Sequence, residues 1–84
     1  MADSPRSDAE LLALAAEVLA GIAPDADLAS VGPDQDLRET LDLDSMDFLN
    51  FVIGLSARLG VAIPEADSPK LYTKAGLLRY LQAL

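Results

Sequence analysis

The sequence predicts an all-α fold: a small four-helix bundle with three main helices, one short helix and a long loop between the first and second main helices. Apolar residues recur at spacings of three and four rather than two, which is the period of a helix face. The chain is 51% hydrophobic but only 5% aromatic, so its core is mainly aliphatic, and such residues favour helices. Because 84 residues suffice for only one core, we expect residues 1–84 to form a single domain.

The first helix is expected to begin at Ser7 or Asp8, either of which can act as its N-cap, and to run to about Gly21. Residues 1–7 are expected to be frayed at the start of the chain. One face of this helix is apolar and should be buried. That face comprises Leu11, Ala15, Val18 and Ile22, widened by Leu12 and Leu19.

The connection from Ala23 to Leu43 is long for a compact domain and contains Pro24, Gly32 and Pro33. Loops of this length often have a function. Isolated apolar residues should tie it down across the core. These anchors are Leu28, Val31, Leu37 and Leu41.

The second main helix is expected to begin at Asp44 or Ser45 and to end near Gly60. Asp44 as N-cap and Asp47 three residues later form a pair like a capping box. Two apolar stripes follow, and one helix in so small a domain cannot easily bury both. We therefore predict that one stripe packs in the core and that the other, which starts beside Ser45, is a docking surface. The core stripe is Phe48, Val52, Leu55 and Leu59 with Phe51 beside it, and the docking stripe is Met46, Leu49 and Ile53.

The C-terminal third begins with an extended connector, 61–64, in which Pro64 excludes a continuing helix. Residues 65–67 are expected to form a single short turn, which Ser68 and Pro69 end. Thr73 is the expected N-cap of the last helix. The leucines expected to point inward from this helix are Leu77, Leu78, Leu81 and Leu84.

Composition narrows the possible chemistry. The chain has no cysteine and no histidine, which removes disulfides, thiol nucleophiles, imidazole bases and the usual zinc ligands. The spaced acids do not form a calcium loop, since reading from Asp34 places Arg38 at the fifth position. Reading from Asp42 places Asp47 where glycine is required. We expect neither a metal site nor catalytic residues of the chain's own.

The net charge of −8 is unevenly distributed along the chain. Residues 1–47 contain twelve acids and two bases (−10), whereas residues 48–84 contain two acids and four bases (+2). A negative field of this kind repels nucleic acid and anionic lipid and attracts basic protein surfaces. No apolar run is long enough to span a bilayer, and the acidic first ten residues do not suit a signal peptide. We expect a cytoplasmic monomer without stable membrane insertion.

Ser45 is the most informative residue. A serine hydroxyl without a neighbouring base is a poor nucleophile, so Ser45 is either an ordinary helix-start residue or a site that another enzyme modifies. A helix N-terminus has free N–H groups and the positive end of the helix dipole, which would stabilise a phosphate ester there.

The surrounding residues decide between these interpretations. The second main helix starts with Leu43-Asp44-Ser45-Met46-Asp47, and residues 48–52, the connector 59–65 and the flanking helices follow the same pattern. Together these features resemble an acyl carrier protein of the phosphopantetheine-bearing four-helix family. The resemblance covers nearly the whole chain. It implies that Ser45 carries covalent 4'-phosphopantetheine, which a separate phosphopantetheinyl transferase transfers from coenzyme A. The terminal thiol of this arm would hold an acyl group as a thioester.

The resemblance also implies roles for the residues around Ser45. Asp44 matches the family's acid before the serine, and Met46, Leu49 and Ile53 should face partner enzymes. The acids Asp42 and Asp47 should attract the basic docking patches of acyl-loading and acyl-processing enzymes.

The chain departs from the family pattern in two ways. Asp42 replaces a glycine found in many carriers, and the second helix lacks the glutamates of many fatty-acid-synthesis carriers. These departures favour a specialised carrier over the general carrier of fatty-acid synthesis. The sequence leaves two kinds of cargo open. One is an acyl intermediate of fatty-acid, polyketide or lipid synthesis, and the other is an aminoacyl, D-alanyl or peptidyl group. A third interpretation is an unmodified helical adaptor that binds a partner helix through the docking stripe.

Overall fold

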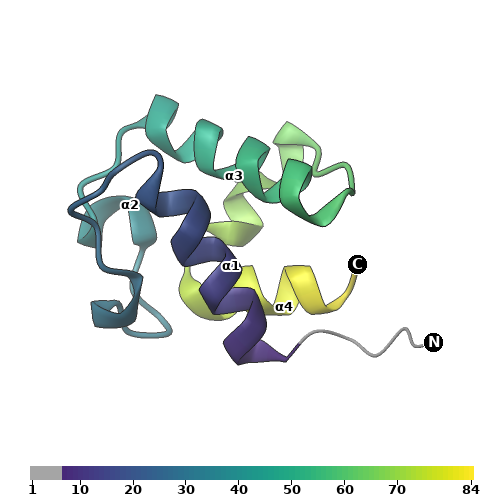
Figure 1. Ribbon diagram of the computed structural model, residues 1–84, viewed down its shortest axis with the longest axis horizontal. Coiled ribbons are helices and arrows are strands. Elements are labelled where there is room, and N and C mark those ends of the chain that lie inside the picture. The colour runs from purple at the N-terminus through teal and green to yellow at the C-terminus, as the bar shows by residue number, and fades with distance from the viewer. Residues whose placement is uncertain (1–6) are drawn as a thin grey trace.

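The computed structural model describes residues 7–84, so the expected fraying of residues 1–7 lies outside the described part except at Ser7. The regular elements within residues 7–84 are all helices, as predicted, and the longer ones, α1, α3 and α4, lie around the core (Figure 1). The elements, with η for a 3₁₀ helix, are α1 (Asp8–Ala20), η1 (Leu28–Ser30), α2 (Leu37–Thr40), α3 (Ser45–Leu59), η2 (Glu65–Leu71) and α4 (Lys74–Gln82).

Helix α1 begins with a complete capping box. The Ser7 hydroxyl accepts from the Glu10 backbone N–H at 3.1 Å, and the Glu10 carboxylate accepts from the Ser7 N–H at 3.2 Å. This arrangement satisfies two of the N–H groups that a helix start leaves free. Ser7 is therefore the N-cap, which is one of the two candidates, Ser7 and Asp8, that the sequence left open.

The long connection between α1 and α3 contains two short helices, η1 and α2, that the apolar pattern did not predict. Asp27 and Asp36 cap them through hydrogen bonds from the backbone N–H two residues on. The connection is also tied to the C-terminal part of the chain. Lys74 Nζ donates to the carbonyls of Leu28 at 3.3 Å and Val31 at 3.0 Å. The anchors Leu28, Val31 and Leu37 are buried and Leu41 is half-buried, so the predicted anchoring is confirmed.

Helix α3 packs against α1 at close range. A Cβ at Gly54 would lie 2.5 Å from Val18 Cγ1, so the two helices approach closely only because residue 54 has no side chain. Arg58 and Glu17 join the same helices by an ion pair of 2.6 Å. The helix ends at Gly60, whose φ of +68° is the left-handed conformation that terminates many helices.

The C-terminal part differs from the prediction in two places. Helix η2 runs through Ser68 and Pro69 to Leu71 instead of ending after one turn, and the Pro69 carbonyl still accepts from the Tyr72 N–H at 3.3 Å. Thr73 caps α4, as predicted, by accepting from the Gly76 N–H. The inward position predicted for Leu84 is wrong: its residue is 56% exposed because α4 ends at Gln82.

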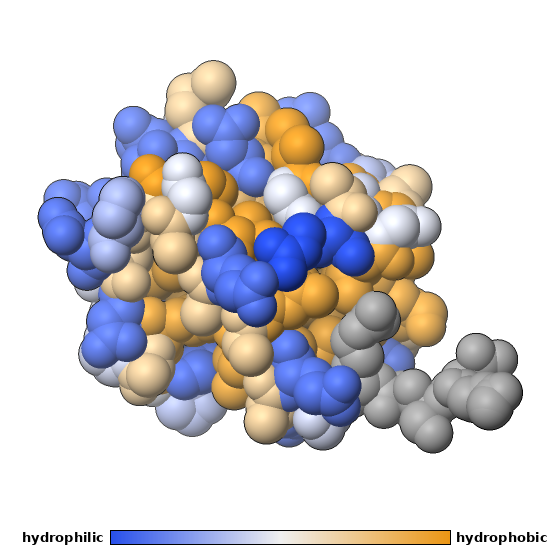
Figure 2. Space-filling model, in the orientation of Figure 1, coloured by the Kyte–Doolittle hydropathy of each residue, from blue (hydrophilic) through white to orange (hydrophobic). Residues whose placement is uncertain are grey.

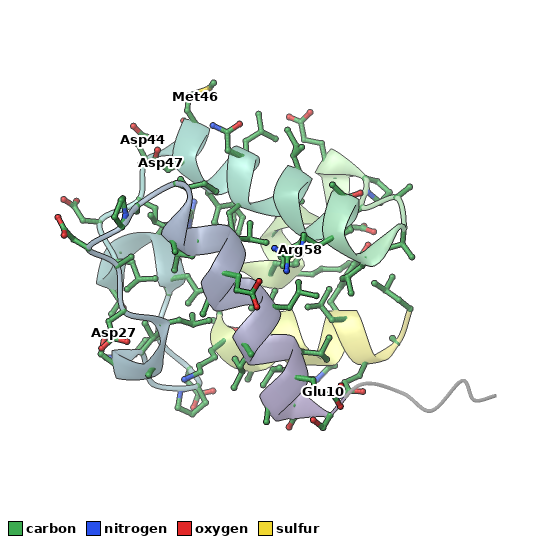
Figure 3. The ribbon with its side chains drawn as sticks, in the orientation of Figure 1. Glu10, Asp27, Asp44, Met46, Asp47 and Arg58 are labelled. Carbon is green, nitrogen blue, oxygen red and sulfur yellow. The ribbon has the colours of Figure 1, made fainter. Side chains whose placement is uncertain are left out.

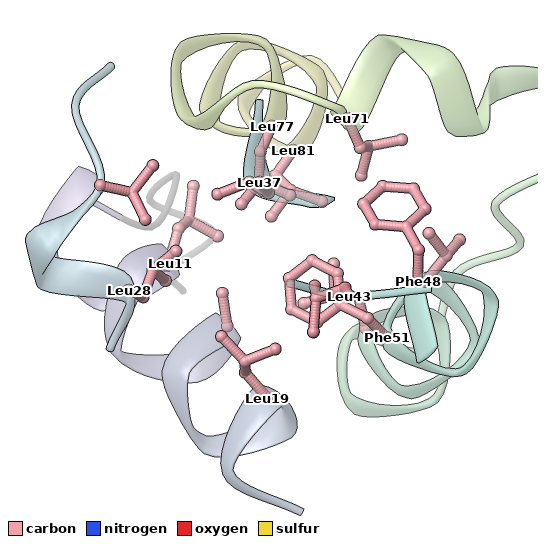
Figure 4. Close-up of a cluster of buried hydrophobic side chains, with 14 residues drawn as sticks. Leu11, Leu19, Leu28, Leu37, Leu43, Phe48, Phe51, Leu71, Leu77 and Leu81 are labelled. Carbon is pink, nitrogen blue, oxygen red and sulfur yellow. The ribbon is translucent and has the colours of Figure 1, made fainter. Parts of the chain in front are cut away.

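All six elements contribute to one aliphatic core with two phenylalanine rings (Figure 4). Among residues 7–84, the fully buried residues are all hydrophobic. On the face seen in Figure 2, apolar areas remain visible between polar ones, which is usual for a small domain. Within residues 7–84, no helix combines the length and apolar character that crossing a membrane requires. The buried residues are Leu11, Ala15, Leu19, Leu28, Val31, Leu37, Leu43, Phe48, Phe51, Val52, Leu55, Leu71, Leu77 and Leu81.

Candidate functional site at the start of α3

Ser45 is the first residue of α3, and its side chain is exposed. A capping box fixes the backbone on both sides of it. The Asp44 carboxylate accepts from the Asp47 N–H at 2.7 Å, and the Asp47 carboxylate accepts from the Asp44 N–H at 3.4 Å. The predicted capping pair is thereby confirmed. Ser45 is thus held at the positive end of a 15-residue helix with its hydroxyl open to approach.

The two predicted stripes of α3 separate into a buried face and an exposed face. Phe48, Val52 and Leu55 are buried with Phe51, and Leu59 is half-buried against the same core. In the second stripe Met46 is 62% exposed, Ile53 is 56% exposed and Leu49 is half-buried. Figure 3 shows Met46 pointing away from the helix bundle, near Asp44 and Asp47. An exposed apolar strip therefore begins directly beside Ser45.

The carboxylates near this end of α3 differ in their exposure and in their hydrogen-bond partners. Asp42, Asp44 and Glu39 are exposed, and Asp47 is half-buried by its capping role. Asp42 has a φ of +56°, which lies in the left-handed region that glycine adopts more readily than other residues. Asp36 is engaged with Arg38, so it adds little to the negative field that partners would meet.

Arg38 is held from two sides. Its Nη2 and Nε donate to Asp36 at 2.9 and 3.3 Å, and its guanidinium carbon lies 3.5 Å from the centre of the Tyr72 ring. The Tyr72 ring in turn packs edge-on against Phe48 at 5.2 Å between centroids. The hydrogen bond with Asp36 raises the pKa of Arg38 and lowers the pKa of Asp36. Arg38 therefore stays protonated and cannot serve Ser45 as a base.

A cavity of about 410 Å³ opens between α3, η2 and this arginine. Ser45, Phe48 and Leu49 line one wall, and residues of η2 line the opposite wall. Sequence reasoning missed this cavity and the contact of Arg38 with Tyr72, because the contributing segments are distant in the chain and share no period. The one feature of the sequence that pointed to a special role for Arg38 is that it is the only basic residue between residues 7 and 57.

Comparison with known proteins identifies the class of this site. The family model described as "Phosphopantetheine attachment site" matches residues 9–68, so the chain belongs to the phosphopantetheine-binding carrier family. The acyl carrier protein of Campylobacter hominis is 32% identical over 63 residues, which cover 75% of this chain and 75% of that protein. These matches confirm the predicted acyl carrier family with covalent 4'-phosphopantetheine as its cofactor, and they do not fit an unmodified helical adaptor.

The residues at the start of α3 fit such a cofactor. The matched region includes a serine that is exposed at a helix N-terminus, where a phosphate group is favoured. A cavity large enough for a small organic group adjoins that serine. Arg38 lines this cavity and brings hydrogen-bond donors to it.

Proposed function

We propose that Ser45 is the residue that carries the 4'-phosphopantetheine arm. The observation that supports this proposal most strongly is the exposed hydroxyl at the first position of α3, held in place by the capping box of Asp44 and Asp47. The arm, once attached, supplies a thiol that holds an acyl group as a thioester.

The attachment reaction needs a separate phosphopantetheinyl transferase. Ser45 Oγ forms a bond to the phosphorus of the phosphopantetheine half of coenzyme A, the pyrophosphate P–O bond breaks, and the nucleotide half leaves. The chain has no histidine, and Arg38 stays protonated, so the transferase supplies the base that takes the hydroxyl proton. The role of this chain is to present the hydroxyl.

Met46, Leu49 and Ile53 form the apolar part of the surface that partner enzymes contact. Asp42, Asp44 and Asp47 border this strip with negative charge, and Asp42 and Asp44 are exposed. Partner enzymes with basic docking patches match this pattern, because opposite charges speed encounter and suppress wrong partners. The negative charge is concentrated at the start of α3, since its later exposed positions include Asn50, Ala57 and Arg58.

This charge distribution favours a specialised carrier with dedicated partners over the general carrier of fatty-acid synthesis. The cargo is an acyl intermediate of fatty-acid, polyketide or specialised lipid synthesis. Incubation of the modified carrier with a panel of acyl, aminoacyl and D-alanyl ligases tests the cargo, because intact mass shows which group is loaded. Loading of an amino acid in preference to every acyl group would favour the aminoacyl alternative.

Intact mass also tests the attachment site. Incubation with coenzyme A and a phosphopantetheinyl transferase should add one phosphopantetheinyl group to the wild-type chain and none to Ser45→Ala. Ser30→Ala is the matched control, since Ser30 is also exposed but lies in η1, and it should be modified like wild type. Equal modification of Ser45→Ala and wild type would refute the proposal.

A further inference from the structure

A second cavity, of about 400 Å³, lies between η2 and α4 and shares no lining residue with the cavity beside Ser45. Figure 1 shows the C-terminal end of α4 well away from the first turn of α3, so the proposed function leaves this cavity without a role. Its lining residues are Lys70 of η2, Gly76, Arg79 and Tyr80 of α4, and Ala83, the C-cap of α4.

Packing between η2 and α4 holds the walls of this cavity in place. Asp67 accepts from the Tyr80 hydroxyl at 2.7 Å and lies 3.3 Å from Lys70 Nζ. Gly76 lets the end of η2 lie close to α4, because a Cβ there would lie 2.5 Å from the Lys70 carbonyl oxygen. The cavity is therefore formed by two packed helices rather than by a loose loop.

Arg79 is the cation that the lining leaves available to an incoming group. Its residue is exposed, and the ion pairs within residues 7–84 give it no carboxylate partner, whereas Lys70 is paired with Asp67. Asp8 reaches the same end of α4, where it accepts from Gln82, but neither Asp8 nor Asp67 lines the cavity. The cavity is thus positive on a chain whose net charge is −8.

Apolar surface adjoins this cation. The Tyr80 ring and the Ala83 methyl group line the cavity, and Leu84 follows Ala83 in the chain. Within residues 7–84 the most exposed large apolar residues are Met46, Ile53 and Leu84. The first two belong to the strip beside Ser45, whereas Leu84 lies outside it. A group that suits this second surface therefore combines an anion with an apolar neighbour.

A protruding acidic segment of a partner protein fits these features better than an extended polyanion does. A nucleic acid or an anionic bilayer meets the field of the whole chain, which repels it. A single carboxylate meets mainly the nearby charges, because salt screens exposed charges beyond about 10 Å. The guanidinium of Arg79 matches a carboxylate with two N–H donors, and a concave site accepts a protruding side chain.

We propose that this cavity, together with Arg79 and Leu84, is a second docking surface, and that it binds a carboxylate side chain with an apolar neighbour on a segment of a partner protein. The carboxylate pairs with Arg79, and the apolar neighbour packs against Tyr80 and Leu84. A partner held here leaves Ser45 open to another enzyme. The inference does not depend on attachment of the arm.

NMR titration of the ¹⁵N-labelled full chain tests this inference. The probes are two acetylated hexapeptide amides, one that alternates leucine with glutamate and one that alternates leucine with glutamine. The glutamate peptide should cause saturable shifts of the amides of Gly76, Arg79 and Ala83. The glutamine peptide should bind at least about fivefold more weakly, which corresponds to the loss of one exposed ion pair, and Arg79→Gln should weaken binding of the glutamate peptide by a similar factor.

Arg58→Gln is the matched control, since it removes an exposed arginine of α3 with the same change of charge, and it should bind the glutamate peptide as wild type does. Circular dichroism should show Arg79→Gln folded, because Arg79 is exposed. Equal affinity of Arg79→Gln and wild type for the glutamate peptide would overturn the inference, as would shifts confined to α3 or the absence of saturable shifts. Phosphatidylglycerol vesicles are the last probe. Vesicle binding that Arg79→Gln abolishes, without peptide binding, would overturn the inference in favour of a membrane surface.

Discussion

Asp42 combines a strained backbone with a negative charge three residues before Ser45. Its φ of +56° lies in the left-handed region, which costs most residues roughly 1–2 kcal/mol relative to the right-handed one. Aspartate tolerates this region better than most side chains, because its short polar group can bond locally. The family resemblance implied that Asp42 stands where many carriers have glycine, and the backbone at Asp42 has the left-handed conformation that glycine adopts most readily.

Substitutions at Asp42 should follow this backbone conformation. Asp42→Val should lower the free energy of unfolding by about 1 kcal/mol or more, because a β-branched side chain is a poor fit to positive φ. Asp42→Gly should stay within about 1 kcal/mol of wild type, since relief of strain is offset by the entropy of glycine in the unfolded chain. Urea denaturation measures both. Equal stability of the valine and glycine variants would contradict this account.

Asp67 links stability to pH. It accepts from the Tyr80 hydroxyl at 2.7 Å and lies 3.3 Å from Lys70 Nζ. The Tyr80 hydrogen bond, with a further contribution from Lys70, lowers the pKa of Asp67 below its ordinary value of 3.8. A lowered pKa in the folded state means that this stabilisation is present above the unfolded pKa and is lost as pH falls through the folded one.

Asp67→Asn keeps an acceptor for Tyr80 but removes the charge. The variant should be less stable than wild type at about pH 7, and the difference should shrink at about pH 3. Urea denaturation of both proteins at the two pH values gives this comparison. A stability difference that is the same at both would show that Asp67 has no altered pKa.

At the scale of single helices, one residue at the start of α3, Asp44, has both a structural and an electrostatic role. Asp44 caps the helix and also carries exposed charge next to Ser45. Asn caps a helix about as well as Asp, so Asp44→Asn separates the two roles.

Asp44→Asn should change stability by no more than about 0.5 kcal/mol, whereas Asp44→Ala should cost about 1 kcal/mol. If the charge guides docking, transfer of the arm to Asp44→Asn should be slower at low salt and close to the wild-type rate at high salt. Asp34→Asn, which removes another exposed charge, is the control and should have a smaller effect. Identical transfer rates for wild type and Asp44→Asn at low salt would argue against electrostatic docking.

The contact of α1 with α3 depends on Gly54. Alanine is favoured over glycine within helices by about 1 kcal/mol, yet a Cβ here would lie 2.5 Å from Val18 Cγ1. Gly54→Ala should therefore fail to stabilise the protein and should cost about 1–3 kcal/mol through overpacking. Combination with Val18→Ala should recover about 1 kcal/mol or more in a double-mutant cycle measured by urea denaturation. Additive effects of the two changes would show that the helices do not touch at this point.

For the whole molecule, the features that could be predicted from the sequence are local or periodic. The Asp44–Asp47 capping box and the two stripes of α3 follow from spacings of three and four residues. The end of α3 follows from the preference of glycine for the left-handed conformation that Gly60 adopts. The contact between Arg38 and Tyr72 joins residues 34 positions apart, and no local pattern encodes it. The exposure of Leu84 was mispredicted because its spacing continues the buried stripe, whereas the helix ends before it.

The charge distribution was also predictable in part, since the overall trend along the chain could be foreseen and the individual ion pairs could not. The acids of the first half gather partly at the start of α3, while Lys70, Lys74 and Arg79 belong to η2 and α4. Under the proposed function, this distribution would bias encounter with basic partner surfaces toward the end of the molecule that contains Ser45. This bias could be foreseen from the charge count, but the pairing of Asp36 with Arg38 could not.

The most direct test of the central claim is peptide mass spectrometry of the chain after incubation with coenzyme A and a phosphopantetheinyl transferase. Fragmentation should place one phosphopantetheinyl group on Ser45 and leave Ser30, Ser56 and Ser68 unmodified. Modification of one of these other serines in place of Ser45, or no modification of the folded chain, would contradict the account.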